Sequence, residues 1–162
     1  MPTGFFGKLP AAGDFVSRGL PAGLRAPLDH WVTTHIAPLA RDAQGWPVGG
    51  VRLTLHLAGE DWLLVTEPSA DAAGRSYPLV ACVPLAGAGR EAADHWADAV
   101  WPILLTGIEG MAGPDTLATT IAQTELLPAE APPLSSPQIW WRGQAPGNPD
   151  QQLLLLERIS SG

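Results

Sequence analysis

The sequence predicts an α+β domain built on a largely antiparallel β-sheet, and two segments carry this prediction. Residues 51–57, VRLTLHL, alternate strictly between apolar and polar side chains, which is typical of a half-buried strand. Residues 90–110 place apolar side chains at steps of three and four, which is typical of an amphipathic helix. Strand-like segments lie before and after the helical ones rather than alternating with them, so we expect antiparallel pairing.

The elements of the first two thirds follow from similar patterns. Residues 24–40 carry apolar side chains at helical spacing and predict a helix that Pro38 bends or ends. After the strand at 51–57 and a turn, WLLVTEP at 62–68 predicts its hairpin partner, and SYPLVACVPL at 76–85 predicts a third strand. In the helix of residues 90–110, Pro102 predicts a kink because it leaves the carbonyl of Asp98 without a helical donor. Asp94 and Asp98 fall opposite the apolar stripe.

The last third predicts a short helix, an extended connection and two closing strands. The helix covers roughly residues 115–126, and the proline-rich residues 128–137 predict the extended connection. QIWWRG at 138–143 and QQLLLLERI at 151–159 predict the strands, joined by a turn at 144–150. The pleat of a strand directs Trp140 and Trp141 to opposite faces. One therefore faces the core, and the other either packs under a covering helix or anchors a partner.

Composition excludes several classes of protein. A chain of 162 residues is the size of one domain, and a net charge of −7 without a basic run disfavours nucleic-acid and anionic-membrane binding. The single Cys82 lies in an apolar run, where a buried hydrophobe is expected, and an intrachain disulfide is excluded. The N-terminus lacks a signal-peptide pattern and no window is long enough for a membrane span. We therefore expect a cytoplasmic protein that starts near Met1.

Catalytic and cofactor-binding patterns are largely missing. Gly7-Lys8 does not form a phosphate-binding loop, because Pro2 and Leu9 occupy the positions of its first glycine and its Ser/Thr. His30 and His35 lie about 140° apart around a helix, so no metal site is expected from them, and no cofactor is expected. No nucleophile elbow is present. General acid or base chemistry by Asp14 or Asp71 stays open, because the sequence gives no distance between carboxylates.

Three short motifs resemble the type VI secretion-associated TagF family. The opening stretch GFFGKLPAAGDFVSRGLP matches the N-terminal family signature at Gly4, Phe5, Phe6, Gly7, Lys8, Leu9, Pro10, Gly13, Asp14, Phe15, Val16 and Arg18. A second family element is matched at Ser69, Asp71, Gly74, Arg75, Tyr77, Pro78 and Leu79. A third, a tryptophan pair followed by a glycine, is matched at Trp140, Trp141 and Gly143. The resemblance spans most of the chain and predicts a single stand-alone domain over residues 1–162, without the PP2C-type phosphatase to which some members are fused.

The resemblance implies both a fold and a role. The fold is similar to longin or profilin-like domains, with a central antiparallel sheet flanked by helices in an α/β/α sandwich. The role is that of a non-catalytic, cytoplasmic accessory protein, a post-translational negative regulator that binds the forkhead-associated scaffold protein of the secretion system. Two alternatives stay open: a small enzyme that uses the motif Asp and Arg residues, and a longin-like adaptor for a GTPase or a membrane.

The motif residues divide into backbone-shaping glycines and charged or aromatic side chains. Gly4, Gly7, Gly13 and Gly74 suit tight or positive-φ turns. The candidate partner-binding residues are Asp14, Arg18, Asp71, Arg75, Trp140 and Trp141. We expect Asp14 or Asp71 to pair with Arg75 and pin the N-terminal segment against the loop before the third strand. A structural ion pair and a partner-contacting patch are both compatible with these charges. Residues 109–137 match no motif, and no oligomeric state is predicted.

Overall fold

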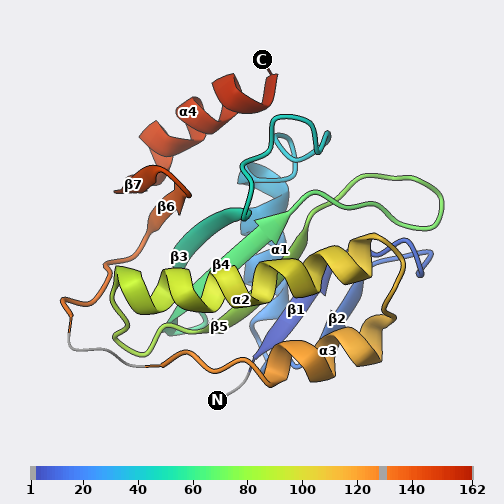
Figure 1. Cartoon of the computed structure of the whole chain (residues 1–162), viewed down its shortest axis with the longest axis horizontal. Coiled ribbons are helices and arrows are strands. Elements are labelled where there is room, and N and C mark those ends of the chain that lie inside the picture. Colours follow the sequence, from blue (N-terminus) through green and yellow to red (C-terminus); the bar gives the residue numbers. More distant parts are fainter. Residues whose placement is uncertain (1–2, 128–130, 162) are drawn as a thin grey trace.

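The computed structural model describes residues 3–127 and 131–161, and its centre is a single antiparallel sheet. Seven strands of the described chain lie in the order β2-β1-β5-β4-β3-β6-β7. Four helices flank this sheet (Figure 1). The strands are β1 (Gly4–Gly7), β2 (Val16–Arg18), β3 (Val51–Leu57), β4 (Glu60–Glu67), β5 (Leu79–Pro84), β6 (Gln138–Trp141) and β7 (Gln144–Gly147), and the helices are α1 (Arg25–His35), α2 (Arg90–Ile108), α3 (Pro114–Ala122) and α4 (Pro149–Ser161).

The three central strands form a meander in which each strand follows its neighbour in the sequence. β3 and β4 pair over their whole length, from Val51 opposite Thr66 to Leu57 opposite Glu60. Their tight turn holds Ala58 and Gly59 at φ of 54° and 79°, the left-handed values that suit the twist of a two-residue hairpin. β4 then pairs with β5. The strands predicted at 51–57, 62–68 and 76–85 are confirmed.

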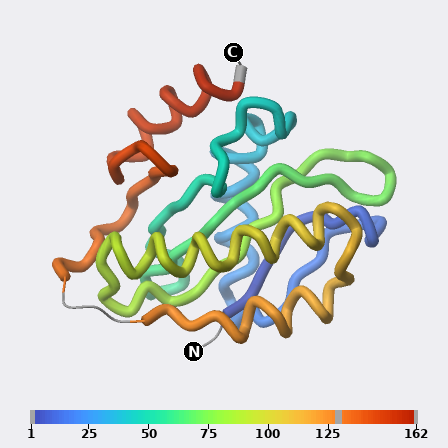
Figure 2. The backbone as a smooth tube through the Cα atoms, in the orientation of Figure 1, coloured from blue at the N-terminus to red at the C-terminus, as the bar shows by residue number. Residues whose placement is uncertain are grey.

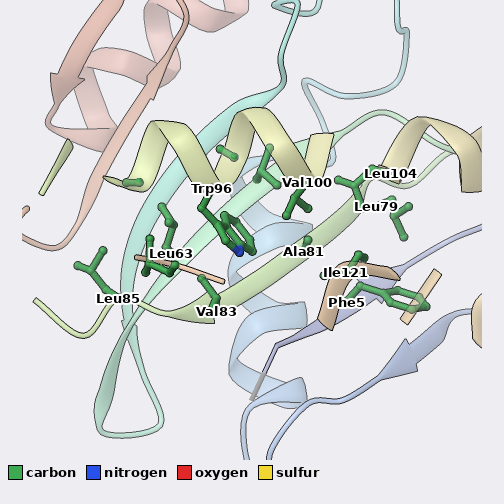
Figure 3. Packing of buried hydrophobic residues seen from close by; sticks show 14 of the residues in the cluster. Phe5, Leu63, Leu79, Ala81, Val83, Leu85, Trp96, Val100, Leu104 and Ile121 are labelled. Carbon is green, nitrogen blue, oxygen red and sulfur yellow. The ribbon is translucent and has the colours of Figure 1, made fainter. Parts of the chain in front are cut away.

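Helices cover both faces of the sheet and enclose two apolar cores. On one face, α2 and α3 pack Trp96, Val100, Leu104 and Ile121 against sheet residues such as Phe5 and Val83 (Figure 3). On the other face, α1 and α4 bury Leu28, Val32 and Leu156 against the opposite side chains of the same strands, and Ile36, directly after α1, is buried with them. The predicted α+β fold, an antiparallel sheet between two layers of helices, is confirmed.

The N-terminal motif forms two short strands that the sequence analysis did not predict. β1 lies between β2 and β5, and alternation sends Phe5 to the α2 side and Phe6 to the α1 side. Gly7 has a φ of +143°, and a Cβ there would lie 2.2 Å from a backbone oxygen, so only glycine fits. Position 4 requires glycine because neighbouring backbone atoms lie too close for a Cβ, and not because of its φ value. Gly13 has neither a close neighbour nor a positive φ. Gly74, at φ +81°, is a turn glycine as expected.

The closing strand predicted at residues 151–159 is wrong, because this segment lies within α4. Four consecutive leucines fit a buried strand and a helix equally well by periodicity alone. The helix begins at Pro149, whose fixed φ suits a first turn, and buries Leu156 on one side only. The segment predicted as a turn, 144–150, contains β7 and the start of α4.

Smaller differences concern helix ends and burial. α1 ends at His35 and not near residue 40, and α3 covers Pro114–Ala122 and not 115–126. β3 is buried on both faces and not only on its apolar one, because α2 covers the side that carries Arg52 and Thr54. Residues 128–130 of the predicted extended connection lie outside the described residues.

Candidate functional site

The two larger sequence motifs meet in one place, beside the edge of the sheet that β1 and β2 form. The segment after β1 and the loop between β4 and β5 run side by side (Figure 2). The backbone N–H of Ala72 donates to the carbonyl of Ala12 at 2.8 Å. The hydroxyl of Ser69 donates to the carbonyl of Lys8 at 2.7 Å. Two segments about sixty residues apart in the sequence are therefore held together by hydrogen bonds. We call this pair of segments, residues 8–18 and 69–77, the motif surface.

Asp71 lies at the centre of the motif surface with its side chain fully buried. One carboxylate oxygen accepts the backbone N–H groups of Ala73 and Arg75, each at 2.9 Å. The other lies 2.8 Å from Arg75 Nε and 3.4 Å from Lys8 Nζ. Loss of water favours the protonated acid, but these hydrogen bonds and positive charges outweigh it, and the pKa of Asp71 is lowered. Asp71 is therefore a structural anion with every oxygen engaged.

Arg75 joins this buried carboxylate to the N-terminal segment. Its Nε donates to Asp71, and its Nη2 donates to the carbonyl of Gly13 at 2.9 Å. The predicted pairing of Asp71 with Arg75, and the pinning of the N-terminal segment by that pair, are confirmed. Asp14 is not the partner, because its carboxylate lies in solvent and accepts the N–H of the adjacent Phe15 at 2.7 Å.

Three motif aromatics connect the motif surface to α1. Phe6 and Phe15 stack with ring centroids 5.5 Å apart, and Tyr77 meets Phe15 edge-on at 4.8 Å. The hydroxyl of Tyr77 donates to Asp29 of α1 at 3.2 Å. Burial raises the pKa of this hydroxyl, so it stays protonated. Lys8 lies 4.9 Å above the Phe15 ring, which adds a cation–π contact.

The six candidate partner-binding residues do not share one environment. Asp14, Arg18 and Arg75 are exposed, and Arg18 donates from Nε to Asp115 of α3 at 2.9 Å. Asp71 is buried. Trp140 and Trp141 point to opposite faces, as predicted, but both are buried in the two cores, since the sheet is covered on both sides. Neither indole is available as an exposed anchor.

A second charged cluster, which the sequence analysis missed, fixes α2 to the sheet. The buried guanidinium of Arg52 donates to Asp94 at 2.8 Å and also to Asp98. The indole N–H of Trp140 donates to the same Asp94 oxygen at 2.8 Å. Burial acts against ionisation of Asp98, but Arg52 and Arg142 outweigh it and lower the pKa of that carboxyl. The sequence signal for this cluster was the pair Asp94 and Asp98, which lie one helical turn apart on the polar side of a helix, together with a single arginine, Arg52, in a strand.

Two further ionisable groups have a perturbed pKa without lying in the motif surface. Burial raises the pKa of Glu67, at the end of β4, to about 7, although the indole N–H of Trp101 donates to it at 3.0 Å and acts in the opposite sense. Burial raises the pKa of the Cys82 thiol to about 12, so a nucleophilic thiolate is not formed near neutral pH. Within residues 3–127 and 131–161, no three His, Cys, Asp or Glu side chains are placed to hold a metal ion. No helix in the described ranges has the length and apolarity needed to cross a membrane.

Comparison with known proteins identifies the family of the chain and a solved structure of similar fold. Residues 4–124 match the model of a family described as the TagF N-terminal domain, type VI secretion system-associated, which confirms the resemblance found in the motifs. The fold is similar to a crystal structure of PA0076 from Pseudomonas aeruginosa PAO1, with a TM-score of 0.61 and 27% sequence identity. That likeness covers 98% of this chain and 77% of the other. No curated protein sequence matches the chain.

Proposed function

Because the chain belongs to the family of TagF N-terminal domains associated with the type VI secretion system, we propose that it is a non-catalytic accessory protein of that system. In this proposal it restrains assembly after translation by binding the forkhead-associated scaffold protein in the cytoplasm. The observation that carries the proposal is the motif surface. Family-motif residues from two distant segments form one internally bonded platform at the sheet edge, with Asp14, Arg18 and Arg75 outward.

The rigidity and the charges of the motif surface suit recognition of a protein. Arg75 and Asp71 fix the two segments relative to each other, so little backbone freedom remains to be lost on binding. The outward charges have both signs, and such rim charges govern the choice of partner and the association rate. The arrangement suits a partner surface with complementary charges.

The chemistry of the same residues supports binding rather than catalysis. A general acid or base must exchange a proton with a substrate, and therefore needs a free oxygen within reach. Asp71 has both oxygens engaged by cations and backbone N–H groups and is buried. Asp14 lies in solvent, where its carboxylate accepts the backbone N–H of Phe15.

The test is a calorimetric titration against the purified scaffold protein of the same bacterium, in phosphorylated and unphosphorylated forms. We expect saturable binding at micromolar or tighter affinity, about −8 kcal/mol or below. Arg18→Ala should weaken it at least about fivefold, because one outward charge is lost while an exposed ion pair contributes little to folding. Asp14→Asn keeps the local hydrogen-bond acceptor, and so isolates the charge.

Arg90→Ala is the matched control, since Arg90 is also an exposed arginine beside a carboxylate but lies on α2, outside the motif surface. The Arg90→Ala variant should bind the scaffold protein with the same affinity as the unmodified protein. If neither form of the scaffold binds, the proposed partner is wrong. If binding occurs but the Arg18 and Asp14 variants match the control, the proposed surface is wrong.

A further inference from the structure

Arg25, the first residue of α1, is exposed at the border of the motif surface and is oriented by two contacts. Its guanidinium carbon lies 5.4 Å from the centroid of the Phe6 ring, and its Nη1 donates to the hydroxyl of Ser17 at 3.3 Å. Phe6 is a family-motif residue, and Ser17 belongs to β2, the strand at this end of the sheet. The side chain of Arg25 is therefore attached to the same edge that carries the motif.

These contacts leave one side of the Arg25 guanidinium open. An arginine binds a carboxylate most strongly through two nitrogens at once, and Arg142 donates from its Nε and Nη2 to Asp98 at 3.3 and 3.1 Å. In Arg25 only Nη1 donates to another described residue. No carboxylate of residues 3–127 or 131–161 forms an ion pair with it. The Nε and Nη2 of Arg25 can therefore accept a carboxylate from another molecule.

The local fold gives Arg25 no structural role that explains its charge. Asp29 follows it by four residues, a spacing at which opposite charges on a helix can pair. One oxygen of Asp29 instead accepts the hydroxyls of Tyr77 and Thr33, at 3.2 and 2.9 Å. Arg25 also lies at the start of α1, where a positive charge is unfavourable because the helix dipole is already positive there. Helix stability therefore does not account for an arginine at this position.

The neighbouring charges favour a carboxylate over a phosphate group as the ligand. Arg18 and Arg75, the exposed arginines of the motif surface, each already donate from Nε to an aspartate. The exposed Asp14 adds a negative charge to the same surface. A phosphate group carries up to about two negative charges and is best bound by several cations. A carboxylate carries one, which the guanidinium of Arg25 balances alone.

We propose that Arg25 binds a carboxylate on an acidic segment of the protein that docks on the motif surface. The inference rests on the proposed function, because it names the chemistry of the partner at that surface. The Nε and Nη2 of Arg25 hold the two oxygens of one Asp or Glu side chain of the partner. The chain has a net charge of −7, so most of its surface repels an acidic segment. An unpaired arginine at one place then fixes the register in which the segment docks.

The first part of the test does not depend on the identity of the partner. The full chain, labelled with ¹⁵N, is titrated with a tetraglutamate peptide with blocked ends, and NMR follows the Nε–Hε signals of the arginines. The Arg25 signal should shift and saturate with a Kd in the millimolar range, as suits one exposed ion pair. A tetraglutamine peptide should leave it unchanged.

Arg41 and Arg158 are the internal controls of this titration. Both are exposed, and neither has an ion pair, ring contact or side-chain hydrogen bond within the described parts of the chain. Their signals should shift much less, because no contact orients them. Equal shifts at all three arginines overturn the proposal. Tighter binding of a phosphothreonine peptide than of tetraglutamate at Arg25 also overturns it, because the ligand is then a phosphate.

The second part uses the calorimetric titration against the scaffold protein. Arg25→Ala should weaken binding about tenfold or more, because a hydrogen-bonded charge pair is lost. Arg25→Lys should recover only part of the affinity, since an ammonium group lacks the planar fork. Thermal unfolding of both variants should stay close to that of the unmodified protein, and Arg41→Ala should change neither affinity nor unfolding.

The two parts separate failure of this inference from failure of the proposed function. If the scaffold protein binds and Arg25→Ala keeps full affinity, the inference is wrong while the proposed function stands. If the scaffold protein does not bind but tetraglutamate still selects Arg25, the proposed partner is wrong and a site for an acidic segment is supported. If tetraglutamate does not shift the Arg25 signal, the inference is wrong whatever the scaffold protein does.

Discussion

Replacing Glu67 by glutamine should stabilise the protein above neutral pH and leave it almost unchanged in mild acid. Glu67 ends β4, where it is half-buried and its carboxylate accepts the indole N–H of Trp101 at 3.0 Å. Burial raises its pKa from the ordinary 4.5 to about 7. Glutamine keeps an oxygen for the Trp101 hydrogen bond and removes the cost of an ionised group at this position.

The direction of this pH effect on stability depends on whether the native or the unfolded state binds more protons. Between pH 4.5 and about 7, the native state keeps Glu67 protonated while the unfolded chain releases the proton. The free energy of unfolding therefore falls as pH rises through this window. The stabilising contribution is complete below pH 4.5 and is lost as pH passes about 7. At about 1.4 kcal/mol per pKa unit, the loss is about 3 kcal/mol at most, since the carboxyl keeps some contact with solvent.

Urea denaturation followed by tryptophan fluorescence at about pH 5 and about pH 8 measures this difference. The glutamine variant should exceed the wild type at the higher pH by up to about 3 kcal/mol, and should lie close to it at the lower pH. Glu91→Gln is the matched control, because Glu91 is exposed in the first turn of α2. A stability difference between Glu67→Gln and the wild type that is the same at both pH values refutes the reasoning.

Three further predictions concern the motif, α4 and the second charged cluster. Gly7→Ala should cost more than about 2 kcal/mol of unfolding free energy, since its Cβ would lie 2.2 Å from a backbone oxygen at φ +143°, while Gly13→Ala should cost less than about 1 kcal/mol in the same denaturation assay. Leu156→Ala should cost about 2–5 kcal/mol and Leu155→Ala much less, because only the former is buried; similar costs would contradict a helix with one buried side. Arg52→Ala should cost at least about 3 kcal/mol and broaden thermal unfolding, since it leaves two carboxylates of α2 without their buried partner; a loss under about 1 kcal/mol would show that the cluster contributes nothing to docking of α2.

The sequence predicted well those parts of the fold that depend on local pattern. The alternation of residues 51–57 and the tight turn after them specify a hairpin whose register depends on no distant residue. The apolar stripe of α2 specifies both the helix and its buried face. The ion pair of Arg75 was predicted only in part, because the sequence left both Asp14 and Asp71 open as its partner, and the structure selects Asp71, four residues away in the same loop.

The parts of the structure that the sequence analysis missed depend on contacts between distant segments or lack a distinguishing local pattern. β1 and β2 are too short and too rich in glycine for a strand pattern, and they form because β5 offers an edge. The leucine run of α4 has no period that distinguishes a strand from a helix. The partner of Arg52 lies more than forty residues further along the chain, so alternation could show which face Arg52 occupies but not that α2 would cover that face.

The position of β1 in the sheet has a consequence for the order in which the protein folds. Phe5 lies opposite Ala81, so β1 pairs with a segment 76 positions later, whereas β3 and β4 are joined by a tight turn and β4 and β5 by the loop at residues 68–78. Closing a long loop costs entropy before any contact repays it, so local pairs form first. We expect the central meander to form early, and β1, which is synthesised before β5, to join the sheet only after β5 has been synthesised. Until then the two phenylalanines of the opening motif stay exposed, and this segment is where nascent chains of this protein are most open to capture by a chaperone.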